Sequence, residues 1–335
     1  MAAARVVAAR AAAALPAAVP AGLLLSALVA GPSHAQDAAL VDRTALADVV
    51  LLSELAQAPP TAGAAWEAAT VAHLSSLLRG DTVPTDPPMP GVLEPSASAL
   101  IARGNGFQRD IVAALGEPDP TAAVSRVVAE YRMQREGTYP AAPKNMDVLY
   151  DHDAALAFRS RFPELSGLRW AGEWARLAVT EPMTDLPDGP EREAGLDTVE
   201  ARYLAKLTPG EPPDAPPSEL PLAPAIAPGL LWVSPEAAMI WDNHSMFVEV
   251  VADILTSADV GDRAEAIDAA AAFFADPTLG VTAQLTWETM ALRHGIFFQG
   301  GFPLAVMTES ERNAHGHGAH QRSGSPMVIP GMIGR

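Results

Sequence analysis

The sequence contains no cysteine among its 335 residues. This absence excludes disulfides, iron–sulfur clusters, thiolate metal sites and the covalent attachment of a c-type haem. The folded state must therefore be stabilised by side-chain packing. A composition rich in alanine, with scattered Trp, Leu and Val, suits packing between helices.

Basic residues are also scarce. The chain has 22 Lys and Arg against 40 Asp and Glu, which gives a formal net charge of −18. Such a surface repels the phosphates of nucleic acids and of anionic lipids, whereas a cation would meet a favourable field. We therefore expect no nucleic-acid partner.

Long apolar runs are confined to the N-terminus. Arg5 and Arg10 precede an uncharged stretch over residues 11–30, and the segment from Ser33 to Ala35 has the small-x-small pattern of a signal-peptidase site. We expect residues 1–35 to be a signal peptide and the mature chain to begin at Gln36. The mature charge is then 20 − 40 = −20, and the protein is expected to be periplasmic or secreted.

A retained membrane anchor is the alternative interpretation of this N-terminal stretch. Pro16 and Pro20 interrupt it, and the uninterrupted part that follows is shorter than the roughly 20 residues that a spanning helix needs. No later segment is long and apolar enough to cross a bilayer. We therefore expect no membrane span after signal cleavage.

The common catalytic motifs are missing. The sequence has no His-Glu-x-x-His, no Gly-x-Ser-x-Gly and no Glu-x-x-His pattern. The segment that starts at Gly104 begins like a dinucleotide-binding loop, but it ends in Arg109 and follows no predicted strand. No catalytic residue is assigned from the sequence.

Apolar residues recur with helical periodicity along most of the chain, which predicts an all-α fold, a helical bundle. Residues 167–180 fit either a helix or a strand, and residues 182–190 are expected to form a loop. The predicted helices span residues 37–58, 62–79, 96–115 (with a break at 104–106), 120–135, 145–161, 193–207, 234–256, 262–275 and 282–294.

The expected domain organisation is a signal peptide (1–35), an N-terminal helical region (36–207), a proline-rich segment (208–229), a C-terminal helical region (230–310) and a disordered His-rich tail (311–335). The proline-rich segment should be extended and exposed. It either links two helical halves or forms a strap across one domain, and the sequence leaves both open.

The helix over residues 234–256 has the strongest pattern. Ser234 is a good N-cap and Pro235 a good first residue. Apolar side chains cover a broad arc, with His244 near its middle, and Glu249 and Asp253 fall on the opposite face, where we expect solvated charges. A buried imidazole needs partners for both nitrogens, so His244 is either a satisfied core residue or a functional ligand.

The C-terminal tail holds the most specific chemical pattern. His315, His317 and His320 are separated by glycine and alanine, so three imidazoles can wrap one ion. Neutral imidazole suits Zn²⁺, Cu²⁺ and Ni²⁺. The alternative is a disordered tail that binds metal only incidentally. Inside the fold, His244 with Met246 and His294 is a second candidate metal site.

Other residue groups have simpler explanations. His73 and His152 each fall on a separate predicted helix, as His244 and His294 do, which would allow a shared site in a bundle. His152 is flanked by Asp151 and Asp153, which is typical of a solvated surface residue. The tryptophans at helical spacing are expected to lie in the core.

Three functional hypotheses follow from the sequence. The first is an exported binding or accessory protein that handles a transition metal, copper or zinc. The second is a helical scaffold or accessory subunit that contacts an envelope protein partner and has no metal role. The third is an enzyme with a buried His-ligated metal or a non-covalent haem. A metal-independent fold separates the second from the first, and a visible absorption band lost in His244→Ala would mark the third.

Overall fold

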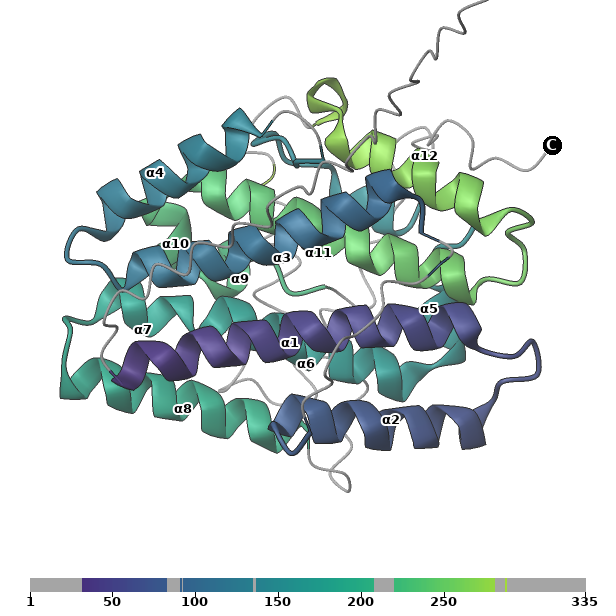
Figure 1. The fold of residues 1–335 in the computed structure, drawn as a ribbon, viewed down its shortest axis with the longest axis horizontal. Helices are drawn as coiled ribbons and strands as arrows, with labels where there is room; N and C mark the ends of the chain where they lie inside the picture. Colours follow the sequence, from purple (N-terminus) through teal and green to yellow (C-terminus); the bar gives the residue numbers. More distant parts are fainter. Residues whose placement is uncertain are drawn as a thin grey trace, which may run out of the picture.

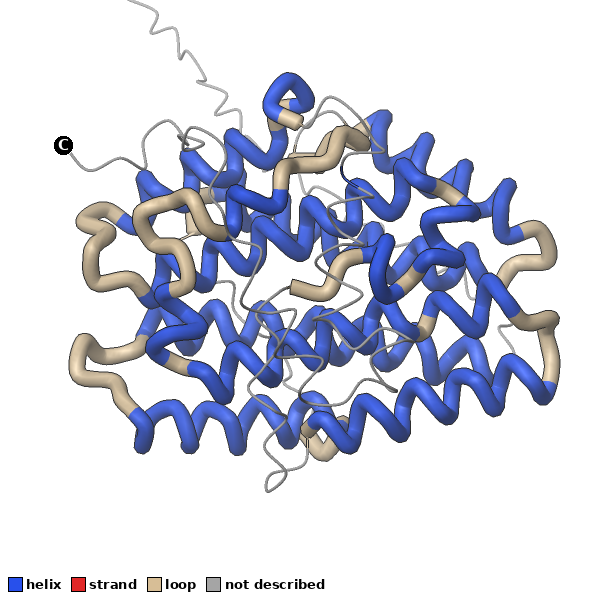
Figure 2. Tube along the Cα trace, turned by 180° about the vertical axis from the view of Figure 1, so that it is seen from behind, coloured by secondary structure: helices blue, strands red, loops and turns tan. Residues whose placement is uncertain are grey.

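The computed structural model describes residues 32–82, 91, 93–134, 137–207, 220–280 and 287, and in these ranges the chain forms helices and connecting loops without any strand. Figure 2 shows these helices and loops from behind. The all-α prediction is therefore confirmed. The helices are α1 (Pro32–Gln57), α2 (Ala64–Arg79), α3 (Pro95–Leu115), α4 (Pro120–Met133), α5 (Ala157–Arg161), α6 (Pro163–Ala178), α7 (Thr180–Asp185), α8 (Pro190–Lys206), α9 (Ala223–Ile226), α10 (Pro228–Val233), α11 (Pro235–Thr256) and α12 (Arg263–Ala275), with two 3₁₀ turns at Met146–Leu149 and Pro277–Leu279.

Local sequence signals place several helix starts. The side chains of Asp119, Ser234 and Asp262 accept backbone N–H groups in the first turns of α4, α11 and α12. Proline occupies the first turn of α3, α4, α6, α8 and α11, where its missing N–H costs no helical hydrogen bond. These N-termini are therefore determined by residues adjacent in sequence.

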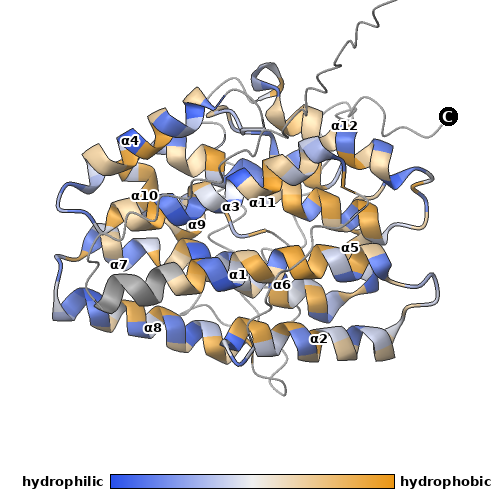
Figure 3. Ribbon diagram, viewed as in Figure 1, coloured by the Kyte–Doolittle hydropathy of each residue, from blue (hydrophilic) through white to orange (hydrophobic). Residues whose placement is uncertain are grey.

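The longer helices run roughly along the long axis of the molecule in stacked rows (Figure 1). Helices α2 and α8 form one edge, α4 and α12 the other, and α1, α3, α6 and α11 lie between them. Polar and apolar residues alternate around most of the outer helices (Figure 3). Burial of each apolar face against the next row forms the core.

Helix α11 is the central element. It contacts α1, α3, α5, α9, α10 and α12, and 19 of its 22 residues are buried. Because neighbours surround it, its polar side chains are buried as well as its apolar ones. The prediction that Glu249 and Asp253 are solvated was wrong: Asp253 is 2% exposed, and Glu249 is partly buried in an ion pair.

One continuous core includes residues from both sides of the proline-rich segment. Leu52 of α1, Ile101 of α3 and Phe247 of α11 all belong to it. Residues before and after the proline-rich segment thus pack in the same core. Residues 208–219 lie outside the described part of the chain, and residues 223–228, expected to be extended, form α9 and the start of α10.

Three other boundaries differ from the prediction. The expected helix over residues 145–161 is a 3₁₀ turn followed by bends and the short helix α5, and the expected loop at 182–190 contains most of α7. Helix α3 runs through Gly104 without a break. The expected signal-peptidase site falls in the first turn of α1, and most of the predicted signal peptide lies outside the described residues.

Candidate functional site

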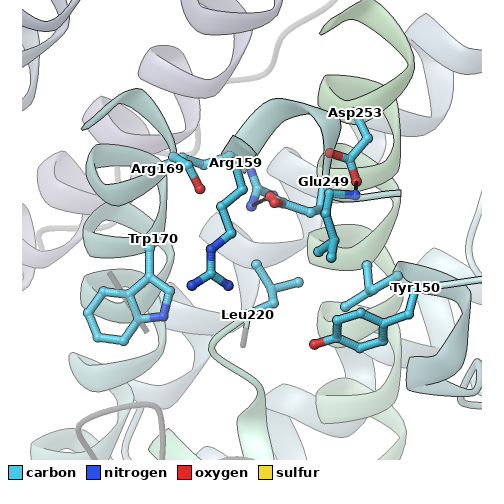
Figure 4. A pocket seen from close by; sticks show the side chains of 10 residues that line it. Tyr150, Arg159, Arg169, Trp170, Leu220, Glu249 and Asp253 are labelled. Carbon is cyan, nitrogen blue, oxygen red and sulfur yellow. Dashed lines mark hydrogen bonds and ion pairs between the residues drawn. The ribbon is translucent and has the colours of Figure 1, made fainter. Parts of the chain in front are cut away.

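A solvent-open pocket lies between α5, α6, α11 and the segment before α9 (Figure 4). Its cavity volume is about 30 Å³, room for a single small group. We refer to it as the interhelical pocket. It is lined by Leu149, Tyr150, Leu156, Arg159, Ser166, Arg169, Trp170, Leu220, Glu249 and Asp253.

An ion pair between α6 and α11 forms one wall of the interhelical pocket. Arg169 donates to the Glu249 carboxylate and, at 2.9 Å, to the backbone carbonyl oxygen of Ser245. Arg169 is 4% exposed, so its guanidinium is held in place by these contacts. Arg159, from α5, extends into the centre of the pocket, and its guanidinium lies between Trp170 and Leu220 (Figure 4).

Asp253 lines the pocket and also holds the start of α5. Its carboxylate oxygens accept the backbone N–H groups of Leu156 at 3.2 Å and Phe158 at 2.9 Å. Leu156 itself has a left-handed backbone with φ of 63° and a side chain exposed at the pocket wall. Burial, together with the neighbouring Glu249, raises the pKa of Asp253 to about 8.

His152 lies behind Asp253. Its Nε2 is 3.7 Å from Asp253 Oδ2, too far for a hydrogen bond, and neither ring nitrogen has a hydrogen-bond partner. Burial lowers the pKa of His152 to about 4, so the ring is neutral at pH 7. The expectation that His152 is a solvated surface residue was wrong, because the side chain turns inward toward α11.

A buried polar network continues from the pocket into the core. Arg176 pairs with both Asp48 of α1 and Glu173 of its own helix. Glu173 in turn accepts from Trp241 Nε1 at 3.1 Å and from the Ser245 hydroxyl at 2.5 Å. The network ties α1, α6 and α11 together, so the pocket wall is built on rigid elements.

His244 has a partner at each ring nitrogen. Tyr139 Oη lies 3.1 Å from Nδ1, and Asn105 Oδ1 lies 2.8 Å from Nε2. Burial, with the positive charges of Arg176 and Arg169, holds the pKa of His244 well below its usual value. A metal ion at this ring would have to displace one of the two partners, and the observed geometry is that of a satisfied core histidine.

The remaining metal-site predictions are not brought together in the described ranges. Met246 is fully buried in the core, and His294, His315, His317 and His320 lie outside the described residues. His73 is half exposed, 3.5 Å from Glu54. Within the part of the chain that the structure describes, no group of three or more His, Asp or Glu side chains is placed to hold a metal ion.

No protein-family model, curated protein or solved structure matches this chain. The functional interpretation of the pocket therefore depends on its geometry alone. Within the described ranges, each helix is too short or too polar to cross a bilayer.

Sequence reasoning missed Arg159, Arg169, His152 and Asp253 as site residues. One signal was available: Glu249 and Asp253 are one helical turn apart on a helix that contains acidic residues and no Lys or Arg. If such an acidic pair is buried, its counter-charge must come from another helix. The aromatic prediction was mostly confirmed, since Trp170, Trp174, Trp241 and Trp287 are buried, but Trp232 is 88% exposed.

Proposed function

We propose that this chain is an exported helical binding protein that holds a small organic ligand in the interhelical pocket. The observation that carries this proposal is the convergence of two guanidinium groups, two carboxyl groups and two aromatic rings on one solvent-open space. Ligand sites in helical proteins combine apolar walls with a few fixed polar groups in this way. The N-terminal pattern supports export.

The arrangement favours binding over catalysis. Both oxygens of Asp253 accept backbone N–H groups, and Arg169 and Glu249 engage each other. These contacts fix the side chains as a wall and leave no nucleophile paired with a base among the residues that line the pocket. The network behind the pocket supplies rigidity, which lowers the entropic cost of ordering a ligand.

Blocking the mouth of the pocket tests this function. Ser166 lines the pocket and is partly exposed on α6, so Ser166→Phe should fill the mouth without disturbing the core. We expect this variant to lose binding of any small molecule that the native protein binds, measured by saturation-transfer NMR. Ser160→Phe, an exposed change on α5 outside the pocket, is the matched control and should bind normally. Equal binding by the two variants would contradict the proposal.

We also propose, as a second function, that the C-terminal tail captures a copper or zinc ion. The sequence that favours it is the triplet of His315, His317 and His320 in a strongly acidic protein. Native mass spectrometry with micromolar Cu²⁺ or Zn²⁺ tests it. The full chain should retain one ion and a chain without residues 314–335 should retain none. Failure of the full chain to retain either ion would leave the accessory-subunit hypothesis, which predicts a metal-independent fold and co-purification with a larger assembly.

A further inference from the structure

A second cavity opens at the end of the molecule where the connections from α1 to α2 and from α11 to α12 lie (Figure 1). It is open to solvent, and its volume is about 450 Å³, a size typical of small-molecule sites. Residues 60–62, residues 256–259, and Ala157 and Arg161 of α5 line it. We refer to it as the terminal groove.

Arg161 forms one wall of the terminal groove, and its guanidinium is engaged by the backbone. It donates to the carbonyl oxygen of Thr256 at 3.2 Å and to those of Pro60 and Ala62 at 2.9 and 3.3 Å. The group also lies over the Phe162 ring, 5.0 Å from its centroid. Arg161 therefore joins α5 to the end of α11 and to the connection after α1, and we assign it no contact with a ligand.

Other hydrogen-bond donors of the groove are also used within the fold. The backbone N–H groups of Ala62, Ala157 and Ser257 donate to carbonyl oxygens, and that of Asp259 donates to Ser257 Oγ at 3.1 Å. Pro60 has no N–H group. A ligand that needs donors from the protein would therefore find few of them here.

The side chains that stay free in the groove are hydrogen-bond acceptors. Asp259 is exposed, and in the described ranges its carboxylate has neither a hydrogen bond nor an ion pair. It lies just beyond the C-terminus of α11, where the last helical carbonyls carry partial negative charge. The exposed hydroxyl of Thr61 adds a further acceptor. A ligand that complements these groups donates hydrogen bonds and carries a positive charge.

A primary ammonium group meets this requirement better than other head groups. It presents three N–H donors on one compact charge, and charge-assisted hydrogen bonds to a carboxylate are the stronger kind. A carboxylate head group would lie beside Asp259 and would find the donors of Arg161 engaged. A hydroxyl would donate one hydrogen bond without a charge. The net charge of −18 also attracts cations to the protein.

We propose that the terminal groove binds a small primary amine, its ammonium group hydrogen-bonded to Asp259 and its apolar body lying against Pro60, Ala62 and Ala157. These three small side chains leave the groove wide enough for such a body. The proposal goes beyond the function proposed for the interhelical pocket and does not depend on it, because no residue lines both sites.

Three probes with a common body isolate the head group: 2-phenylethylamine, 2-phenylethanol and 3-phenylpropanoate. Each is titrated at pH 7 into the full-length protein labelled with ¹⁵N, and the amide chemical shifts give both the dissociation constant and the place of binding. We expect 2-phenylethylamine to shift the amides of the groove and to bind at least about 10-fold more tightly than the other two, since one charge-assisted contact accounts for a difference of this size.

Variants of two exposed aspartates test the predicted contact. Asp259→Asn should weaken binding of 2-phenylethylamine by about 10-fold or more. Asp197→Asn, an exposed change on α8, removes an equal charge far along the sequence from the groove and should leave the affinity unchanged. Thr61→Trp should fill the groove and abolish binding. Circular dichroism checks the fold of each variant, and if Thr61→Trp is unfolded the two aspartate variants decide.

Four results would overturn the proposal. The first is equal binding of 2-phenylethanol, and the second is binding of the amine that Asp259→Asn does not weaken. The third is equal weakening by Asp259→Asn and Asp197→Asn, which would show only a diffuse attraction to an acidic surface. The fourth is no binding of the amine at millimolar concentration, which would leave the interhelical pocket to its own test. Binding that is lost in Ser166→Phe and kept in Thr61→Trp would place the amine in the interhelical pocket and would also overturn it.

Discussion

At the scale of single residues, Gly104 shows how a small residue makes room for a buried ring. A Cβ atom at this position would lie 2.2 Å from His244 Nδ1. The His244 ring is itself held between Tyr139 and Asn105 and cannot shift without losing a hydrogen bond. Helix α3 therefore continues through a residue that lowers its intrinsic helix propensity, because the tertiary contact requires it.

Gly104→Ala should destabilise the protein by roughly 1–3 kcal/mol through overpacking against His244. At Gly106, two residues along the same helix, an added methyl group would have its nearest neighbour, the tip of the Arg109 side chain, 3.7 Å away. Gly106→Ala should therefore stabilise α3, by about 0.5–1 kcal/mol. Urea unfolding measures both changes. If the two variants are equally stable, the close contact with His244 is not a constraint.

His152 should make the protein sensitive to acid. Its folded pKa of about 4 lies below the ordinary histidine value of 6.5, so its contribution to stability is complete above pH 6.5 and is lost as the pH falls toward 4. His152→Leu should lose less stability than the native protein between pH 7 and pH 4. At pH 7 the change should be nearly neutral, because neither ring nitrogen has a partner to lose.

Thermal unfolding across this pH range measures the effect. His73→Leu, a change at a half-exposed side chain on α2, is the control. If the stability of His152→Leu falls as steeply between pH 7 and pH 4 as the stability of the control, the prediction is contradicted.

At the scale of helices, buried polar side chains connect elements that are far apart in the sequence. Asp48 of α1, Arg176 of α6 and Glu249 of α11 belong to one network with Arg169 and Glu173. Such a network stabilises only while each charge has its partner. It therefore fixes the relative positions of α1, α6 and α11, and with them the wall of the interhelical pocket.

Arg176→Met should destabilise the protein by about 3–5 kcal/mol, because Glu173 would stay buried without its counter-charge and Asp48 would keep only the longer contact with Arg169, at 3.9 Å. Adding Asp48→Asn to this variant should recover part of the loss, so the two changes should not be additive in urea unfolding. Arg126→Met, at an exposed pair with Glu117, should change stability by less than about 1 kcal/mol. Additive losses at Arg176 and Asp48 would show that the pair is not coupled.

At the scale of the whole molecule, burial of carboxyl groups in an acidic protein makes its stability depend on pH. Burial raises the pKa of Glu181 to about 7 and the pKa of Asp253 to about 8. The shift at Glu181 occurs although its carboxylate accepts the backbone N–H of Gly229 at 2.8 Å. A group with a raised folded pKa contributes stability that is present at low pH and lost as the pH rises through that value.

Stability contributed by these groups should therefore decline from about pH 4, near their unfolded values of 4.5 and 3.8, to about pH 8, and should level off above that. Glu181→Gln removes one of the two groups and should flatten this decline in thermal unfolding. Glu191→Gln, an exposed change on α8, should leave the decline as it is. A native protein whose stability is constant over this range would contradict the prediction.

The sequence alone determined the helical class and several helix starts, because periodicity and caps such as Ser234 act between residues a few positions apart. It also indicated that most of the tryptophans lie in the core. The same local reasoning placed Glu249 and Asp253 on a solvated face, because an amphipathic pattern on one helix carries no information about what covers its polar side.

Only the tertiary structure decided which residues meet at the pocket. Arg169 pairs with Glu249 across 80 residues, and His152 is buried against Asp253 across about one hundred. Such pairings depend on how α5, α6 and α11 pack around one core. The charged groups are all present in the sequence, but burial by distant helices selects which of them become partners and shifts their pKa values.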